Sequence, residues 1–411
     1  MIEQELYYDP FDYRIDDDPY PVWARLRAEA PLYYNEKHNF YALSRYDDVA
    51  QALPDWQAYR SGRGTTADIL FSGIEVPPGI LLFEDPPLHD LHRRLLSRVF
   101  TPRRMAAVEG RVREFCHRAL DPLRDVDGFD FVTQLGAVLA MRTIGFLLGI
   151  PESDQQVIRD GTDERITVGS DGSGTDVSAA IFQDSMVAFA EYIDWRARHP
   201  SDDLMTDLLT AEVETADGAL RPLERGEVLA YTAMIAGAGN ETSARLIGFM
   251  GQLLGEHPDQ RRALVADPAL IPAAVEETLR FEAPSPVQAR YVARNVEWHG
   301  QRVAEGSYLL LLNGSANRDH RHFADPDRYD IHRRAGHLSF GQGIHFCLGA
   351  ALARLEARVA FEEVLARWHD WEVDYPNAQR ARTSSVRGWA RMPVKTRVEP
   401  CDSSVRGRWT R

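Results

Sequence analysis

The chain has 411 residues, of which 44% are hydrophobic and 27% are charged, the composition of an ordinary globular protein with a large core. Its 47 Lys and Arg against 62 Asp and Glu give a net charge of −15, which argues against a general nucleic-acid-binding protein. Three cysteines cannot build a disulfide framework, and they favour a reducing, cytoplasmic setting.

Neither a secretory signal nor a membrane anchor is expected. Residues 1–18 are rich in acidic and aromatic side chains and lack a basic region followed by an apolar one. No window approaches the roughly 18 consecutive apolar residues of a membrane span.

Apolar residues recur every three to four positions along most of the chain, which predicts a mainly helical protein. In chain order, the expected elements are a helix over 19–30, a strand over 40–43, helices over 105–126, 131–148, 182–199, 223–256 and 275–281, strands over 288–296, 302–303 and 308–312, and a helix over 348–368. The Gly- and Ser-rich residues 169–176 are predicted to form a loop. We predict one large, mainly α domain with small β-sheets over residues 1–398, followed by a flexible tail over 399–411.

The residues around one cysteine carry the strongest motif. Residues 340–349 read Phe-Gly-Gln-Gly-Ile-His-Phe-Cys-Leu-Gly, with a helical pattern directly afterwards. This places Cys347 just before a helix N-terminus, where backbone N–H groups and the helix dipole stabilise a thiolate. Glycines let the backbone approach a large, flat group closely. Cys116 is expected to be a buried small hydrophobe, and Cys401 an incidental thiol in the tail.

The decapeptide resembles the haem-binding loop of the cytochrome P450 family. The resemblance covers nearly the whole chain and implies the P450 fold with haem b as cofactor. It implies that the thiolate of Cys347 ligates the iron, an arrangement that favours O–O cleavage. It also implies that Phe340 shields the sulfur, that His345 bonds a haem propionate, and that Gly349 completes the loop.

Residues 238–243, Ala-Gly-Asn-Glu-Thr-Ser, lie within the longest expected helix. A carboxylate next to a hydroxyl relays protons, and a Gly with a Thr in mid-helix opens the backbone ladder. Taken alone, the pair is better interpreted as a solvated Glu and a packing Thr. The apolar surround and the resemblance to the family's acid–alcohol pair favour Glu241 and Thr242 as catalytic residues that supply protons to dioxygen.

Three further groups are assigned by the resemblance. Glu277 and Arg280, spaced i, i+3, match the family's structural Glu-x-x-Arg pair, with Arg328 as its third member. Removing one member of such a buried network strands a charge. His89 and Arg93, spaced i, i+4, together with Arg290, match positions that bind haem propionates. His92 and Arg94 are expected to point elsewhere.

The expected substrate is a hydrophobic small molecule, since the predicted pocket is largely apolar. The candidate lining residues are Ile235, Ala238, Val287 and Trp389, and the surrounding roof is expected from 65–82, 160–180, 286–288 and 386–389. Arg245 and Arg387 are candidates to meet a substrate carboxylate, but positions at the surface are the favoured expectation.

Electrons must come from separate proteins, a ferredoxin and its reductase, because no fused redox domain fits in 411 residues. A basic stripe is the candidate docking surface for the ferredoxin, although a solvated surface stripe is the simpler interpretation. Its members are Arg93, Arg94, Arg98, Arg103, Arg104, Arg354 and Arg358.

Together these features predict a cytoplasmic haem-thiolate monooxygenase that oxidises a hydrophobic molecule with O2. Two alternatives remain at this point. One is a peroxide-driven or ring-coupling haem-thiolate oxidase, which the acid–alcohol pair disfavours. The other is a non-catalytic haem-binding sensor, which the same pair disfavours.

Overall fold

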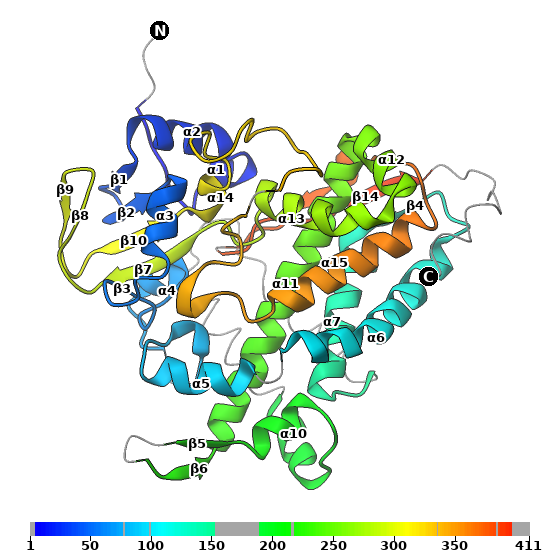
Figure 1. Cartoon of the computed structure of the whole chain (residues 1–411), viewed down its shortest axis with the longest axis horizontal. Helices are drawn as coiled ribbons and strands as arrows, with labels where there is room; N and C mark the ends of the chain where they lie inside the picture. Colours follow the sequence, from blue (N-terminus) through cyan, green and yellow to red (C-terminus); the bar gives the residue numbers. More distant parts are fainter. Residues whose placement is uncertain are drawn as a thin grey trace.

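The computed structural model describes residues 5–76, 79–97, 100–152, 189–214, 218–334, 336–383 and 385–396. The predicted tail over 399–411, with Cys401, and the predicted loop over 169–176 lie outside these residues. The described chain is mainly α with small β-sheets, as predicted, and forms a single domain (Figure 1).

Helices account for most of the described structure. The α-helices are α1 (Tyr13–Asp17), α2 (Tyr20–Glu29), α3 (Tyr46–Ala52), α4 (Ala67–Ser72), α5 (Leu88–Ser97), α6 (Pro102–Leu120), α7 (Ala137–Leu148), α10 (Leu204–Leu209), α11 (Arg225–Glu256), α12 (Pro258–Ala266), α13 (Ile271–Phe281), α14 (Asn313–Ala316) and α15 (Ala350–Leu365). Residues 189–198 are also helical. Most of these helices lie on the right and lower side of Figure 1.

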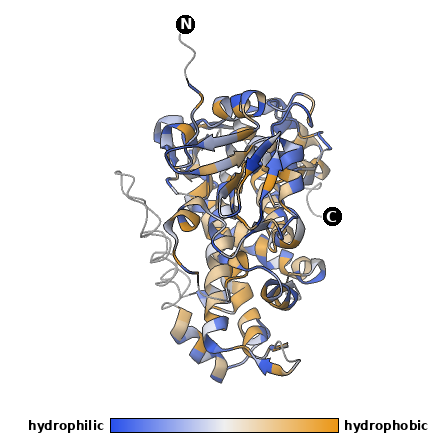
Figure 2. Ribbon diagram, turned by 90° about the vertical axis from the view of Figure 1, so that its left-hand side faces the viewer, coloured by the Kyte–Doolittle hydropathy of each residue, from blue (hydrophilic) through white to orange (hydrophobic). Residues whose placement is uncertain are grey.

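Helix α11 runs through the middle of the helical part and is the element on which the site is built (Figure 1). Its 32 residues span about 48 Å, and a capping box between Glu224 and Glu227 fixes its start. A π-helical turn, Phe131–Gly136, packs closely against it. The approach requires glycine on α11, since a Cβ at Gly251 would lie 2.5 Å from the Phe131 ring. Figure 2 shows hydrophobic residues along the helices in the middle of the molecule.

One helical stretch, Phe131–Leu148, has the length and the mean hydropathy, 1.6, of a membrane span. Within the fold, 61% of that stretch is buried, and it packs against α11. A single such helix is weak evidence for a span, because a buried core helix passes the same test.

The largest sheet has the strand order β1-β2-β10-β7-β3 and joins two segments distant in sequence, residues 32–60 and 288–311. Strand β10 pairs in parallel with β2, Leu309 opposite Tyr41, and antiparallel with β7 (Figure 1). The sheet strands are β1 (Leu32–Asn35), β2 (Phe40–Leu43), β3 (Tyr59–Arg60), β7 (Gln288–Val292) and β10 (Tyr308–Leu311). The remaining strands are β4 (Gly128–Asp130), β5 (Glu212–Glu214), β6 (Leu220–Pro222), β8 (Val296–Trp298), β9 (Gln301–Val303), β11 (Trp371–Val373), β12 (Gln379–Arg380), β13 (Trp389–Arg391) and β14 (Pro393–Thr396).

A buried ion-pair network joins α13 to the segment that precedes the cysteine loop. Arg280 donates from Nε and Nη2 to the Glu277 carboxylate, both at 2.7 Å, and each side chain is 1% exposed. The third member is Arg333, whose Nε donates to Glu277 Oε1 at 3.2 Å. The prediction of Arg328 in this position is wrong. Its side chain is exposed, and it is its backbone carbonyl that accepts from Arg280 and Arg333, both at 3.2 Å.

Candidate active site

The cysteine loop is held open by two backbone conformations that favour glycine. Gly341 and Gly343 have φ values of +67° and +72°, and a Cβ at Gly343 would lie 2.6 Å from Pro54 Cα. A 3₁₀ turn, Gly343–His345, follows, and the Cys347 amide donates to the Phe340 carbonyl at 2.8 Å. Helix α15 then begins at Ala350, so Cys347 lies just before a helix N-terminus.

Two opposing effects act on the thiol of Cys347. Burial raises the pKa of Cys347, whereas the backbone N–H groups of Gly349 and Ala350, together with Arg93 and Arg354, act to lower it. The pKa is raised overall because burial has the larger effect. The helix N-terminus therefore does not hold a thiolate by itself, and a bound cation would supply the missing stabilisation.

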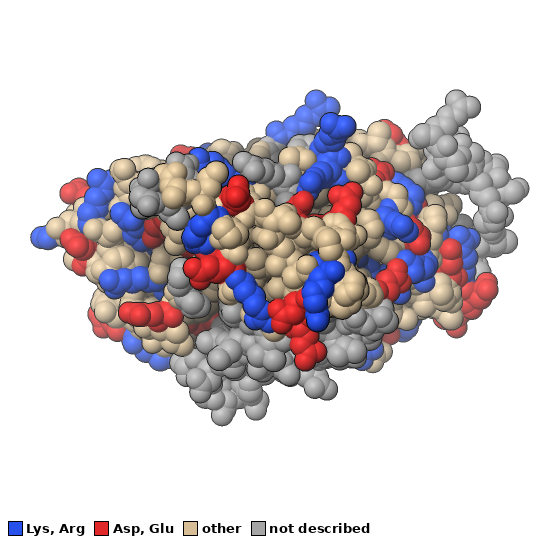
Figure 3. Space-filling model, turned by 90° about the horizontal axis from the view of Figure 1, so that it is seen from below, with Lys and Arg blue, Asp and Glu red and all other residues tan. Residues whose placement is uncertain are grey.

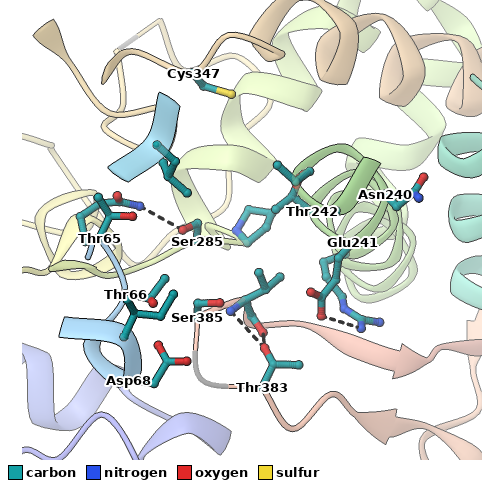
Figure 4. A pocket seen from close by; sticks show the side chains of 18 of the residues that line it. Thr65, Thr66, Asp68, Asn240, Glu241, Thr242, Ser285, Cys347, Thr383 and Ser385 are labelled. Carbon is teal, nitrogen blue, oxygen red and sulfur yellow. Dashed lines mark hydrogen bonds and ion pairs between the residues drawn. The ribbon is translucent and has the colours of Figure 1, made fainter. Parts of the chain in front are cut away.

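A cavity of about 1950 Å³ opens beside the cysteine loop. It is bounded by α11, α5 and the β12–β13 hairpin, and by the segments 65–76, which contains α4, 80–83 and 284–290. Figure 4 shows Cys347 on one wall and Thr242 on α11. Thr65, Thr66, Ser285, Thr383 and Ser385 lie on the wall away from the sulfur (Figure 4).

Three cationic or protonatable side chains line one edge of this cavity, namely Arg93, Arg290 and His345. His89 does not line the cavity but lies against His345. The His89 and His345 rings lie 4.5 Å apart, and the Nε2 atoms of both are buried without a hydrogen-bond partner. Within the described residues neither arginine forms an ion pair with a carboxylate. Burial, followed by repulsion from Arg290, His89 and Arg93, lowers the pKa of His345 to about 2.

The neighbouring cations on α5 do not join this group. His92 Nδ1 pairs with Glu84 Oε2 at 2.7 Å, and the exposed Arg94 hydrogen-bonds the Asp90 carbonyl. Neither His92 nor Arg94 lines the cavity.

The residues present fit a haem group. The cavity is about twice the upper end of a usual small-molecule pocket, which leaves room for a large group beside a substrate. A Cβ at Gly349 or Gly237, both of which line the cavity, would meet no atom within 4 Å. The unpaired cations would meet the two propionates, and Cys347 supplies a soft sulfur ligand for the iron.

The predicted acid–alcohol pair lies on the cavity side of α11. The Thr242 hydroxyl donates to the Ala238 carbonyl at 2.8 Å, the i to i−4 bond expected of Thr in mid-helix. The helix continues unbroken through this point. The Glu241 carboxylate is held by Arg245, whose Nη2 donates at 3.1 Å and whose Nη1 donates to the Trp389 carbonyl (Figure 4).

Comparison with known proteins shows to which family the chain belongs. The cytochrome P450 family model matches residues 176–396. A Mycobacterium tuberculosis protein provisionally named cytochrome P450 123 is 40% identical over 96% of this chain and 98% of its own. The chain belongs to the cytochrome P450 family.

Further relatives agree. Cytochrome P450 107B1 of Saccharopolyspora erythraea is 35% identical over 94% of this chain and 96% of its own. The structure of a mutant of P450 EryK in complex with erythromycin B matches with a TM-score of 0.84 and 30% identity, covering 94% of this chain and 98% of that one. Cytochromes P450 are monooxygenases that bind haem through a cysteine thiolate, so this P450 is a haem-dependent oxidoreductase that uses O2, a small-molecule substrate and redox partners.

Two of the four predicted substrate-pocket residues line the cavity of this P450, and two do not. Ile235 and Ala238, on α11, line it. Val287 instead packs into the core beside the large sheet, and its neighbour Gln288 lines the cavity. Trp389 is buried and donates from Nε1 to Gln252 at 2.7 Å, so the prediction for Val287 and Trp389 is wrong. The predicted roof segment 160–180 lies outside the described residues.

The expected surface positions of Arg245 and Arg387 are also wrong. Their side chains are 12% and 4% exposed, and each has a carboxylate partner, Glu241 for Arg245 and Glu282 for Arg387. A different arginine, Arg380, lines the cavity and was not predicted. Its only signal in the sequence was its place a few residues before the predicted roof segment 386–389.

Three members of the predicted basic stripe have acidic partners. Arg354 pairs with Glu276 at 2.6 Å, Arg358 with Glu109 at 2.6 Å and Arg104 with Asp207 at 2.7 Å. Arg98 lies outside the described residues. On the face shown in Figure 3, Lys and Arg alternate with Asp and Glu and form no broad field of one sign.

Proposed function

We propose that this P450 inserts oxygen from O2 into a hydrophobic small molecule, with electrons delivered by a ferredoxin and its reductase, in the cytoplasm. The observation that carries the proposal is the large cavity that Cys347 and Thr242 both line, whose wall is mostly apolar with some hydroxyls and charged groups. Relatives of similar sequence and fold act in natural-product chemistry, among them a hydroxylase involved in himastatin biosynthesis, which fits this substrate class.

In this proposal each part of the site has one task. Haem, when bound, supplies the one-electron and dioxygen chemistry. Cys347 would ligate its iron, Phe340 would cover the sulfur, and Gly349 would leave the approach clear. His89, Arg93, Arg290 and His345 would hold the propionates by charge-assisted hydrogen bonds.

Glu241 and Thr242 move protons on the substrate side. The Thr242 hydroxyl donates to Ala238 in the structure, and rotation about its χ1 redirects that proton into the cavity. Glu241 lies next to it, with its charge held by Arg245, and is positioned to return a proton from the solvent side.

Electron delivery by a ferredoxin would need a docking surface, for which the basic stripe is the candidate. Three members of the stripe have acidic partners, so the exposed members that form no ion pair with the described residues, Arg94 and Arg103, are the cations to test. Reversing both charges to Glu is expected to slow reduction by ferredoxin at low salt and to have little effect at high salt. An unchanged rate at low salt would remove this surface from docking.

The primary test is the spectrum of the reduced carbon monoxide complex. A haem-thiolate protein shows a red-shifted Soret band, and a Cys347→Ser variant is expected to lose it. A Soret band without this red shift in the wild-type protein would contradict the proposal. A sensor without turnover would show the band but no product when ferredoxin, its reductase and a substrate that shifts the spin state are supplied.

The acid–alcohol pair separates O2 chemistry from peroxide-driven chemistry. Thr242→Ala is expected to release more hydrogen peroxide per electron consumed, while the carbon monoxide spectrum stays unchanged. Unchanged coupling in this variant would remove Thr242 from proton delivery. Faster product formation from added peroxide than from O2 in the wild-type enzyme would favour the peroxide-driven alternative.

A further inference from the structure

Four arginines lie in or beside the cavity wall formed by α11 and the β12–β13 hairpin. Three have carboxylate partners, in the pairs Arg245–Glu241 (3.1 Å), Arg382–Asp17 (2.7 Å) and Arg387–Glu282. The fourth is Arg380, whose side chain donates no hydrogen bond to any residue in the described ranges and forms no ion pair with one. It is therefore the one cation of this group whose charge the described part of the protein leaves without a direct partner.

The position of Arg380 is fixed by the hairpin and by an aromatic ring. It lies opposite Trp389 in the β12–β13 pairing, and its guanidinium lies over the Trp389 indole, 3.9 Å from the ring centroid. The Nη1 atom is buried. Arg380 and its neighbours Gln379 and Ala381 line the cavity, so the other N–H groups of Arg380 are the ones that a ligand can reach.

The carboxylates near Arg380 do not fully neutralise its positive charge. Two carboxylates, Glu282 and Asp16, lie near enough to favour its charged form. Glu282, however, already pairs with Arg387 and with Arg318, and Asp16 lies 3.9 Å from Arg387. Arg318, Arg387 and Arg380 thus all draw on Glu282, and Arg318 has a further carboxylate partner, Asp327, at 3.5 Å. Burial, followed by repulsion from Arg387, lowers the pKa of Arg380, which shows that the cost of burying this cation is only partly offset.

We propose that Arg380 binds a carboxylate on the substrate, so that this P450 takes an apolar molecule with a carboxylate at one end. A guanidinium forms two parallel N–H···O bonds with a carboxylate, and Trp389 holds it flat and preoriented. Thr383 and Ser385, from the same hairpin, lie on the wall away from Cys347 (Figure 4). A carboxylate held at this hairpin leaves the apolar part of the molecule to extend toward the Cys347 side.

The inference rests on the proposed function for the substrate site but is tested by binding alone. The haem-loaded enzyme is titrated with two acid and ester pairs, dodecanoic acid with methyl dodecanoate and 4-phenylbutanoic acid with its methyl ester. Dissociation constants are measured by calorimetry and by the spin-state shift of the Soret band. In the wild-type enzyme the acid of at least one pair is expected to bind about tenfold or more tightly than its ester.

Three variants locate the preference. Arg380→Gln is expected to bind the acid and the ester equally, and Arg380→Lys to retain part of the preference, since Lys keeps the charge but loses the two-point geometry. Arg382→Gln is the matched control, because Arg382 also lines the cavity but is neutralised by Asp17. This variant is expected to keep the full preference.

The inference is overturned if neither acid binds more tightly than its ester in the wild-type enzyme. It is also overturned if Arg380→Gln keeps the preference, or if Arg382→Gln loses as much of it. Should Arg380→Gln fail to fold, Arg380→Lys is used in its place. If this variant shows the same ratio of ester to acid dissociation constants as the wild-type enzyme, two-point binding by Arg380 is contradicted. A missing thiolate-type Soret band would instead count against the proposed function, whereas the calorimetric ratio does not depend on that band.

Discussion

The buried arginines of this P450 fall into two regions that differ in what balances their charge. In the scaffold, Arg280 is neutralised by Glu277, and backbone carbonyls accept its remaining N–H groups. At the edge of the cavity, Arg93 and Arg290 have no carboxylate partner among the described residues, although Arg290 is 3% exposed. A buried cation that the protein neutralises holds the fold together, whereas one left unpaired beside a cavity marks where the charge of a ligand belongs.

The largest expected effect comes from breaking the neutralised region. Glu277→Gln leaves Arg280 and Arg333 without their shared carboxylate, which is expected to cost about 3–5 kcal/mol of stability. The yield of folded, haem-loaded protein and the thermal unfolding temperature measure this loss. Arg328→Gln is the control and is expected to match the wild-type protein, since its side chain is exposed. If Arg328→Gln were as damaging as Arg333→Gln, our assignment of Arg333 would be contradicted.

A buried acid without a cation provides the converse case. Glu356, on α15, lies beside the hydroxyls of Ser243 and Thr143 and is 1% exposed. Burial raises the pKa of Glu356 from 4.5 to about 7, while the two hydroxyls act to lower it. Between these values the folded state retains a proton that the unfolded chain releases, so the contribution of Glu356 to stability is lost as pH rises through this window.

Glu356→Gln removes this pH dependence. The stability of the variant relative to the wild-type protein is expected to rise between pH 5 and pH 8, by up to roughly 3 kcal/mol. Denaturant unfolding of the two haem-loaded proteins at both pH values measures the change. A stability difference that is the same at pH 5 and pH 8 would show that Glu356 keeps one protonation state throughout.

Removing an unpaired cation is expected to affect haem binding more than folding. Arg290→Gln or Arg93→Gln takes away one charge-assisted hydrogen bond to a propionate, worth about 1.5–3 kcal/mol, and haem loss should accelerate about tenfold or more. The rate of haem transfer to excess apomyoglobin measures it. Arg94→Gln, from the same helix but outside the cavity, is the control and should lose haem at the wild-type rate. Equal rates in all three variants would contradict the role of Arg93 and Arg290.

The smallest effect is expected where a neutralised pair lies at the surface. Burial opposes ionisation of Glu276, but hydrogen bonds from Arg354 and His337 lower its pKa to about 2. The Arg354 and Glu276 side chains are 39% and 38% exposed, so solvent screens their attraction. Arg354→Gln is therefore expected to cost less than about 1 kcal/mol in denaturant unfolding at pH 7. If Arg354→Gln lost as much stability as Glu277→Gln, the distinction between surface and scaffold ion pairs would be contradicted.

Local patterns explain which parts of the structure could be predicted. The cysteine loop and α11 were predicted because glycine spacing and helical periodicity are written in consecutive residues. The small strands β11 and β12 were not, since two or three residues of ordinary composition carry little signal and their strand partners lie further along the chain. The π-helical turn at Phe131–Gly136 was predicted only as helix, because its extra residue follows from packing on α11.

The site errors share a physical cause. Adjacent residues of an extended segment point to opposite sides, so Gln288 lines the cavity and Val287 does not. The acidic partners of the basic stripe are distant in sequence, as with Glu109 and Arg358, and only the packing of α6 on α15 brings them together. Local sequence patterns therefore do not predict ion pairs between residues so distant in sequence.

The way Arg333 is bound has a consequence for how the chain can vary. Besides Glu277, Arg333 donates to the carbonyls of Ala324, Asp325 and Arg328, at 2.7, 3.0 and 3.2 Å. The segment is therefore recognised through its main chain, which every amino acid provides. The exposed side chains at 324 and 328 can therefore vary in evolution, whereas Asp325, with φ at +46°, is restricted to the few residues that accept a left-handed backbone.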